Sequence, residues 1–275
     1  MLTFYISLII IAIIAGLIGS LLGIGGGLII IPILVFLFHI DIKIAIGASI
    51  ISVIATSSGA ASAYLKDKFI NIRVGMFLEI ATTLGAITGA ILLGVIDPKI
   101  LFFIFSIVLL ISIYPMLARK DKKKINIQND YISEKLNLNS SYIDNNNTVK
   151  YNVNNTPYGL LMMYIAGLIS GLLGIGSGVF KVIALDDIMH LPIKVSTTTS
   201  NFMIGVTALA SSVIYLIHGY INPYIALPVL SGVFIGSIIG AKILKKVSNN
   251  ALIKIFSIII AIIAIEMFLR GLGLL

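Results

Sequence analysis

The sequence predicts an all-α polytopic membrane protein built from two inverted repeats, each with five helical segments. Three observations predict this class. Hydrophobic residues make up 59% of the 275 residues and charged residues 11%, whereas a soluble domain has about 45–50% apolar and about 25% charged residues. Apolar runs of about twenty residues, the length of a membrane-spanning helix, recur along the chain. The sequence also repeats itself.

The composition excludes several other classes. A transmembrane barrel needs strands of alternating polarity, and these runs are apolar throughout. The chain has no cysteine and three histidines, which excludes thiolate sites and is too few for a metal cage; we expect no metal and no cofactor. Much of the net charge of +8 lies in the short stretch 119–124, which indicates orientation in a bilayer and not a nucleic-acid surface.

Residues 16–72 align without a gap onto 167–223. The matched pairs include Leu21–Gly27 with Leu172–Gly178, His39 with His190, Lys43 with Lys194, Ser49 with Ser200 and Asn71 with Asn222. We therefore divide the chain into an N-terminal transmembrane repeat (1–118), a flexible linker rich in Asn, Lys and Ser (119–156) and a C-terminal transmembrane repeat (157–275).

The lengths of the apolar runs and the breaks between them predict the helices. In the first repeat they are 4–22, 28–40, 44–65, 74–95 and 99–118, and in the second 158–173, 179–190, 194–217, 223–243 and 250–270. The second segment of each repeat is short, since a dozen residues reach only about 18 Å of a hydrocarbon core of about 30 Å. Whether these short arms cross the bilayer or re-enter it stays open.

The distribution of positive charge predicts the orientation. Lys66, Lys68 and Arg73 place the turn before the fourth segment in the cytoplasm, whereas the equivalent turn of the second repeat has no fixed charge. In the second repeat the lysines stand instead around the next connection between helices, at Lys242, Lys245 and Lys246. Equivalent loops thus face opposite sides, as in an inverted repeat. Five crossings per repeat put the linker in the cytoplasm and both termini outside the cell membrane; the alternative is eight helices, four per repeat.

A glycine-rich break precedes each short arm. The N–H groups at the start of a helix have no intrahelical partner and favour anions, and two inverted copies would bring two such ends together near the middle of the bilayer. The candidate cavity-lining residues are Gly25, Gly26 and Gly27 in the first break and Gly176, Ser177 and Gly178 in the second. The alternative is close helix packing, which we assign to the earlier glycines Gly16 and Gly167.

Polar residues are concentrated in the second repeat. Lys181 follows the second break, and a lysine at such depth suggests a functional role; the alternative is an ion pair with Asp186 or Asp187. Five consecutive polar residues open the next helix, with Ser49 as one counterpart in the first repeat; local bonds to the backbone are their alternative role. These candidate anion ligands are Thr197, Thr198, Thr199, Ser200 and Asn201.

Three carboxylates are candidates for ion coupling: Glu79, Asp186 and Asp187. For Glu79 we favour a surface pair with Arg73 or Lys66 over a coupling role. Tyr215 and its repeat counterpart Tyr64 are expected to be interfacial anchors.

The motif Leu21–Gly27, its return at Leu172–Gly178 and the stretch Thr197–Met203 resemble the TauE/SafE sulfite exporter family of membrane anion permeases. The resemblance covers both repeats and implies transport of a small sulfur oxyanion or organic sulfonate. The two copies differ where Ser177 replaces Gly26 and Ile183 replaces Pro32.

The sequence thus predicts a transporter of a small anion that works by alternating access between its repeats, with the substrate and the lipid bilayer as partners and no nucleic acid. The alternatives are an intramembrane enzyme, for which no catalytic motif is present, and a non-transporting accessory subunit. Substrate identity, transport direction, the coupling ion and homo-oligomer formation stay open.

Overall fold

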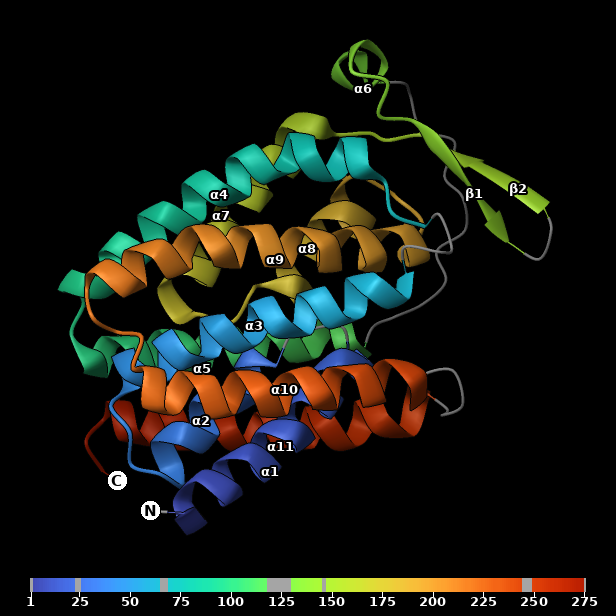
Figure 1. The fold of residues 1–275 in the computed structure, drawn as a ribbon. Helices are drawn as coiled ribbons and strands as arrows, with labels where there is room; N and C mark the ends of the chain where they lie inside the picture. The colour runs from blue at the N-terminus through green and yellow to red at the C-terminus, as the bar shows by residue number, and fades with distance from the viewer. Residues whose placement is uncertain are drawn as a thin grey trace.

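The structure is a computed structural model that describes residues 2–22, 26–64, 69–117, 130–144, 147–243 and 249–274. The helices are α1 Leu2–Leu22, α2 Gly27–Phe36, α3 Ile42–Tyr64, α4 Ile72–Val95, α5 Pro98–Leu117, α6 Tyr131–Lys135, α7 Thr156–Leu173, α8 Gly178–Ile183, α9 Ile193–Ile217, α10 Pro223–Ile243 and α11 Asn249–Gly271, with a π-helix η2 at Ala184–Ile188 and strands β1 Ser140–Asp144 and β2 Asn147–Tyr151 (Figure 1). Six helices of the described part are long and apolar enough to cross a membrane. The predicted all-α polytopic class is confirmed.

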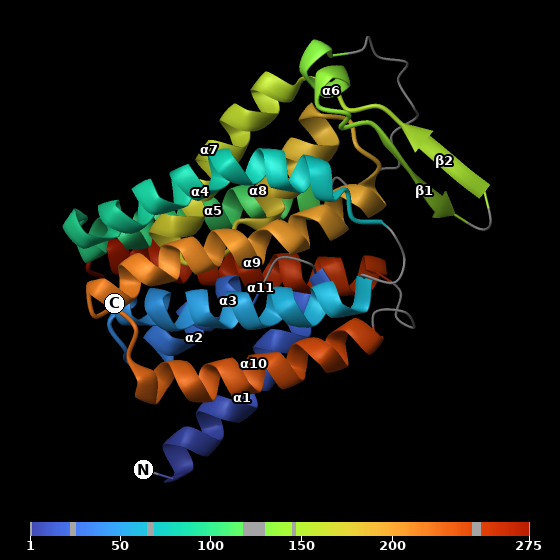
Figure 2. The same cartoon turned by 45° about the horizontal axis from the view of Figure 1, so that its top comes forward.

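The helix contacts follow a two-fold pattern. Under the repeat, α1 corresponds to α7, α3 to α9, α4 to α10 and α5 to α11. Helix α1 packs on α10 while α4 packs on α7, α3 packs on α10 while α4 packs on α9, and α3 and α5 each pack on their own counterparts. Exchanging the repeats therefore reproduces these contacts. The chain colours also show α3 and α9 running in opposite directions (Figures 1 and 2). Both observations support the inverted-repeat interpretation, which stays our proposal.

Equivalent glycines make the two largest contacts in equivalent ways. A Cβ at Gly85 of α4 would overlap the carbonyl oxygen of Tyr164 in α7, and a Cβ at Gly236 of α10 would overlap that of Ile13 in α1. These partners are themselves repeat counterparts. Small residues thus let the helix backbones approach closely, as is typical of membrane helices. Gly167 meets the backbone of Thr82 in the same way, so the packing role expected for the earlier glycines fits the structure.

The short arms end in equivalent turns. Helix α2 has ten residues, and α8 has six before it continues as η2. His39 and His190 adopt positive φ values of 51° and 59°, and the following N–H groups, of Ile40 and Leu191, donate back to residues Leu34 and Leu185. A left-handed residue with such a bond terminates a helix. The shared helix-ending turn gives a physical reason why the same residue, histidine, stands at both equivalent positions.

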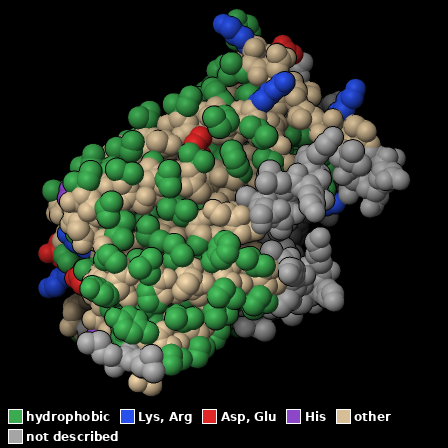
Figure 3. Space-filling view, in the orientation of Figure 1, with side chains coloured by type: hydrophobic (Ala, Val, Ile, Leu, Met, Phe, Trp, Pro, Cys, Tyr) green, Lys and Arg blue, Asp and Glu red, His purple; other side chains and the backbone are tan. Residues whose placement is uncertain are grey.

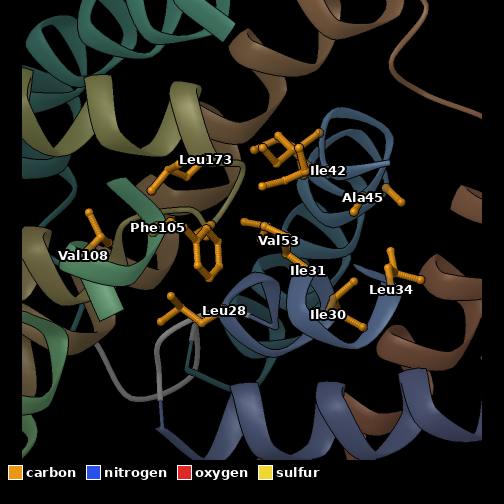
Figure 4. Close-up of a cluster of buried hydrophobic side chains, with 14 of the residues drawn as sticks. Leu28, Ile30, Ile31, Leu34, Ile42, Ala45, Val53, Phe105, Val108 and Leu173 are labelled. Atoms are coloured by element: carbon orange, nitrogen blue, oxygen red, sulfur yellow. The ribbon is translucent and has the colours of Figure 1, made fainter. Parts of the chain in front are cut away.

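Helix α2 lies inside the bundle. Leu28 and Ile31 of α2 gather with Val53 of α3, Phe105 of α5 and Leu173 of α7 in one buried cluster (Figure 4). The exterior is apolar too: on the face seen in Figure 3, hydrophobic side chains are spread over the helices, and charged side chains are few and lie mainly near the ends of the bundle. An apolar exterior around an equally apolar core is what a lipid environment requires.

The segment 119–156 corrects an expectation. Residues 130–144 and 147–156 are not the flexible linker predicted from composition, because they contain α6 and the antiparallel hairpin β1–β2. Polar side chains fix the position of this segment. The Asp130 carboxylate accepts from Ile132 N and from the hydroxyl and N–H of Thr156. Asn71, the residue that caps the start of α4, donates to Leu138 O and Tyr151 Oη at 2.9 Å each. Both termini lie at the opposite end of the bundle (Figure 1). The residues 118–129, with the basic stretch, lie outside the described residues.

The pKa of two groups in this segment departs from the ordinary value. Burial alone would raise the pKa of Asp130, but the hydrogen bonds from Thr156 and Ile132 outweigh burial and hold the pKa below its usual range. Burial raises the pKa of Tyr151 despite its hydrogen bond with Asn71. The Asp130 carboxylate is therefore a structural acceptor that joins the start of α6 to the start of α7.

Candidate functional site

The two glycine breaks meet inside the bundle. A Cβ at Gly27 would lie 2.9 Å from the carbonyl oxygen of Gly174 and 2.9 Å from Cα of Ile175. Ser49 of α3 donates to the same carbonyl oxygen at 2.8 Å. The structure thus brings together Gly27, Ser49 and the end of α7, where Gly174 caps the helix with φ of 65°. Gly25 lies outside the described residues.

The second break carries the sharper turn. Gly176 and Ser177 have φ values of 74° and 46°, and the whole stretch from Gly174 to Gly178 is buried. The Ser177 hydroxyl has no hydrogen-bond partner within the described part of the chain. Gly26, its repeat counterpart, has helical geometry with φ of −65°, and a Cβ there would come no closer than 3.5 Å to another atom. The two copies therefore differ in backbone as well as in side chain.

Helix α9 supplies polar groups beside the second break. Ser200 donates to the carbonyl oxygen of Gly178 at 3.2 Å, and Ser57 of α3 donates to that of Asn201 at 2.6 Å. The Asn201 side chain is 5% exposed. Ser200 thus contacts the second break, and the role predicted for Ser200 and Asn201 in anion binding stays a prediction.

The threonines that precede them have a different environment. Thr197 bonds back to Ile193 O at 2.9 Å, Thr198 donates to Lys194 O and Phe69 O, and Thr199 accepts from Asn71 N at 3.1 Å. These hydroxyls hold α9 to the segment before α4. The structure gives them the local backbone bonds that were the alternative to anion binding.

Lys181 is the centre of a buried polar cluster. Its side chain is fully buried, and Nζ donates to Thr207 Oγ1 of α9 at 2.5 Å. Thr207 in turn donates to Glu79 Oε1 of α4 at 2.5 Å. Glu79 is 6% exposed, and its Oε2 has no partner within the described residues. An ammonium and a carboxylate thus share one hydroxyl between three helices, where water does not screen them.

This cluster corrects one expectation. The surface pair favoured for Glu79 is wrong, because the carboxylate is buried and bonds to Thr207, while Arg73 donates to Asn137 O at 3.1 Å; Lys66 lies outside the described residues. The Lys181 ammonium donates to Thr207, and its alternative pairing with Asp186 or Asp187 stays a prediction. Both aspartates lie in η2 next to the hairpin segment, where Asp187 is exposed and Asp186 half-buried.

Two further residues were misjudged or missed. Tyr215 is not an interfacial anchor, because it is fully buried and its hydroxyl donates to Gly171 O at 2.5 Å. The sequence pattern did not identify Thr207, although Thr56 stands at the equivalent position of the first repeat. Thr56 bonds within its own helix, to Ser52 O. Among the described residues, no group of three or more His, Asp or Glu could hold a metal ion.

Comparisons with known proteins agree with this architecture. A family model described as "Sulfite exporter TauE/SafE" matches residues 8–267. The chain is 27% identical to "Probable membrane transporter protein YunE" of Bacillus subtilis (strain 168), over 97% of this chain and 98% of that protein. It is 27% identical to "Probable membrane transporter protein MJ0441" of Methanocaldococcus jannaschii, over 95% and 94%. No solved structure matches the chain significantly.

Proposed function

Because the chain belongs to the TauE/SafE sulfite exporter family and is a membrane transporter, we propose that it carries a small anion, a sulfur oxyanion or an organic sulfonate, through a site where its two glycine breaks meet. The family name supports this substrate class. The chemistry of the buried residues supports it independently.

The observation that carries the proposal is the position of Lys181. A lysine ammonium has three donors and no acceptor, and this one is fully buried on the arm that begins directly after the second break. A buried charge is retained at such depth only where it is compensated or used. A tetrahedral oxyanion that reached Lys181 would also find the unpartnered Ser177 hydroxyl and the Asn201 amide.

The arrangement of the helices supports alternating access. Helices α3 and α9 pack on each other and also on α10 and α4, so a rocking movement of one repeat against the other would open the central region to either side. We assign the end that carries α6 and the hairpin to the cytoplasm, because α4 begins there with Arg73 and the basic linker residues follow α5. Both termini then lie outside a cell membrane.

The test is anion flux into proteoliposomes that contain the purified protein alone. Sulfite, sulfate, thiosulfate and short sulfonates are compared, first by their effect on thermal stability and then by flux. We expect flux for at least one of them, and we expect Lys181→Met to abolish it while Lys99→Met, at an exposed position, leaves it unchanged. Absence of wild-type flux with every anion, or full flux in Lys181→Met, overturns the proposal.

A further inference from the structure

We propose that Glu79 is the proton-binding site of this transporter, and that the substrate anion and the Glu79 carboxylate compete for the Lys181 ammonium through Thr207. This inference rests on the proposed function, since it assumes an anion that reaches Lys181. It adds the coupling ion, the residue that carries it and the direction of coupling.

The hydrogen-bond geometry places the three groups in a chain. Thr207 Oγ1 lies 2.5 Å from Lys181 Nζ and 2.5 Å from Glu79 Oε1, so the hydroxyl accepts from the ammonium and donates to the carboxylate. It has a second acceptor within reach, Met203 O at 2.9 Å. When Glu79 no longer accepts this hydrogen bond, the Thr207 hydroxyl can therefore donate to the carbonyl oxygen of Met203 instead.

Glu79 has few other sources of compensation. Thr83 lies 3.5 Å from Oε1, and Oε2 is buried without a partner in the described part of the chain. On the elements around it, the other ionisable side chains are Arg73, Tyr158, Tyr164, Asp186, Asp187, Lys194 and Tyr215. Arg73 bonds to Asn137 O, Tyr164 to Thr88 and Tyr215 to Gly171 O. Lys181 is thus the cation that the described hydrogen bonds connect to Glu79.

The repeat shows that the fold does not need these charges. In the first repeat, Ile30 stands at the position of Lys181 and Thr56 at that of Thr207, while the second repeat has Leu230 at the position of Glu79. Ile30 is as buried as Lys181, at 2% exposed. The equivalent positions of the other half of the molecule are therefore occupied by apolar side chains, whereas this site holds an acid and a base. A charged pair that packing does not require, at intramembrane depth, indicates function.

Substrate binding and proton binding then favour each other. An anion on Lys181 removes the charge that compensates Glu79, and a buried carboxylate without compensation takes up a proton. That proton comes from water on the side to which the site is open. After the change of access, the proton leaves Glu79 to water on the other side, the carboxylate regains Lys181, and the anion is released. Anion and proton move in the same direction, so an inward proton gradient drives anion uptake.

The test measures anion and proton movement together in proteoliposomes. Thiosulfate and methanesulfonate are the probes, because both are anions of strong acids and carry no proton themselves near neutral pH. For one proton per anion, and with the membrane potential held at zero because thiosulfate with one proton still carries a negative charge, an inward gradient of one pH unit should raise internal anion about tenfold over the value without a gradient. Glu79→Gln should still exchange thiosulfate, at a changed rate, but should lose the tenfold accumulation. Thr207→Ser keeps the hydroxyl and should keep the coupling, whereas Thr207→Val should lose it.

The outcomes separate this inference from the proposed function. Wild-type flux that does not respond to the proton gradient, or gradient-driven accumulation in Glu79→Gln, overturns the coupling role and leaves the anion transporter intact. No wild-type flux of any anion overturns both. If a single variant fails to fold, the double variant Lys181→Ile with Glu79→Leu gives both positions the apolar residues of their repeat counterparts, Ile30 and Leu230. It should fold, and it should release or take up no proton when thiosulfate is added.

Discussion

The link between Lys181 and Glu79 predicts a large coupling energy in a double-mutant cycle of stability. The two charged atoms are at most about 5 Å apart, because each lies 2.5 Å from Thr207 Oγ1. With an effective dielectric constant of about 20, two unit charges at this separation attract each other by about 3 kcal/mol. Lys181→Ile and Glu79→Leu alone each leave one buried charge uncompensated, whereas the double variant leaves none.

The assay is calorimetric unfolding of the four proteins in detergent at neutral pH. For a chain of this size, each kcal/mol of stability shifts the unfolding midpoint by about 2–4 °C. The midpoint decreases of the two single variants, added together, should therefore exceed the decrease of the double variant by roughly 6–12 °C. The singles should also bind or release a proton that the wild type does not, seen as a pH-dependent midpoint. If the two single effects simply add up to that of the double variant, within about 0.5 kcal/mol, the hydroxyl does not connect two charges and the reasoning fails.

Three further predictions concern packing, the linker and the second break. Gly85→Val should abolish folded protein, because its Cβ would overlap the carbonyl oxygen of Tyr164 in α7. Gly26→Ala should express normally, since the atom nearest to its Cβ, Thr56 Oγ1, is 3.5 Å away. Size-exclusion profiles of the two variants and the wild type test this difference. The Asp130 carboxylate, whose pKa is held below the usual range, stabilises 130–156 above about pH 4 and loses this contribution as the pH falls through the folded-state pKa. Asp130→Asn should remove that acid dependence in hydrogen exchange, and an unchanged profile would refute it. Ser177→Gly should raise stability by about 1 kcal/mol and lower anion flux; a gain or no change in flux would contradict the role given to its hydroxyl.

Much of the fold was predictable because its signals are local. The apolar run lengths predicted the order of helices and short arms, and the residues shared between Gly16 and Asn222 predicted two related halves. The glycine contacts and the histidine turns then fall at equivalent positions. The hairpin was not predictable in this way, since its polar composition is also that of a disordered linker. Its order depends on bonds from Asn71, a residue distant in sequence.

The site was less predictable because its members come from separate helices. Thr207 lies 128 residues from Glu79 and 26 from Lys181, and nothing in the spacing of α4 shows which of its faces meets α9. Arg73 is close to Glu79 along the chain, and this proximity suggested the wrong partner. The missing information was the rotation of one helix about its axis, which depends on packing against α7 and α9. Ser200 and Asn201 could be identified from the sequence because they stand near the start of α9, the helix that follows the short arm in the chain.

The two breaks differ in a way that indicates function at the second one. Left-handed backbone suits glycine and is unfavourable for serine, yet the left-handed position holds Ser177 while its right-handed counterpart holds Gly26. Backbone preference alone would reverse these two residues. A serine kept in strained backbone, with a buried and unpartnered hydroxyl, is explained if the hydroxyl itself is used, because strain is retained where function requires the group. Lys181, four residues after Ser177, likewise replaces an apolar residue, Ile30, with a group that can bind an anion. We infer that duplication supplies two related breaks at the centre of the bundle, and that their chemistry is divided between the repeats: Ser177 and Lys181 of the second repeat face the anion, whereas Glu79 of the first repeat takes up the proton.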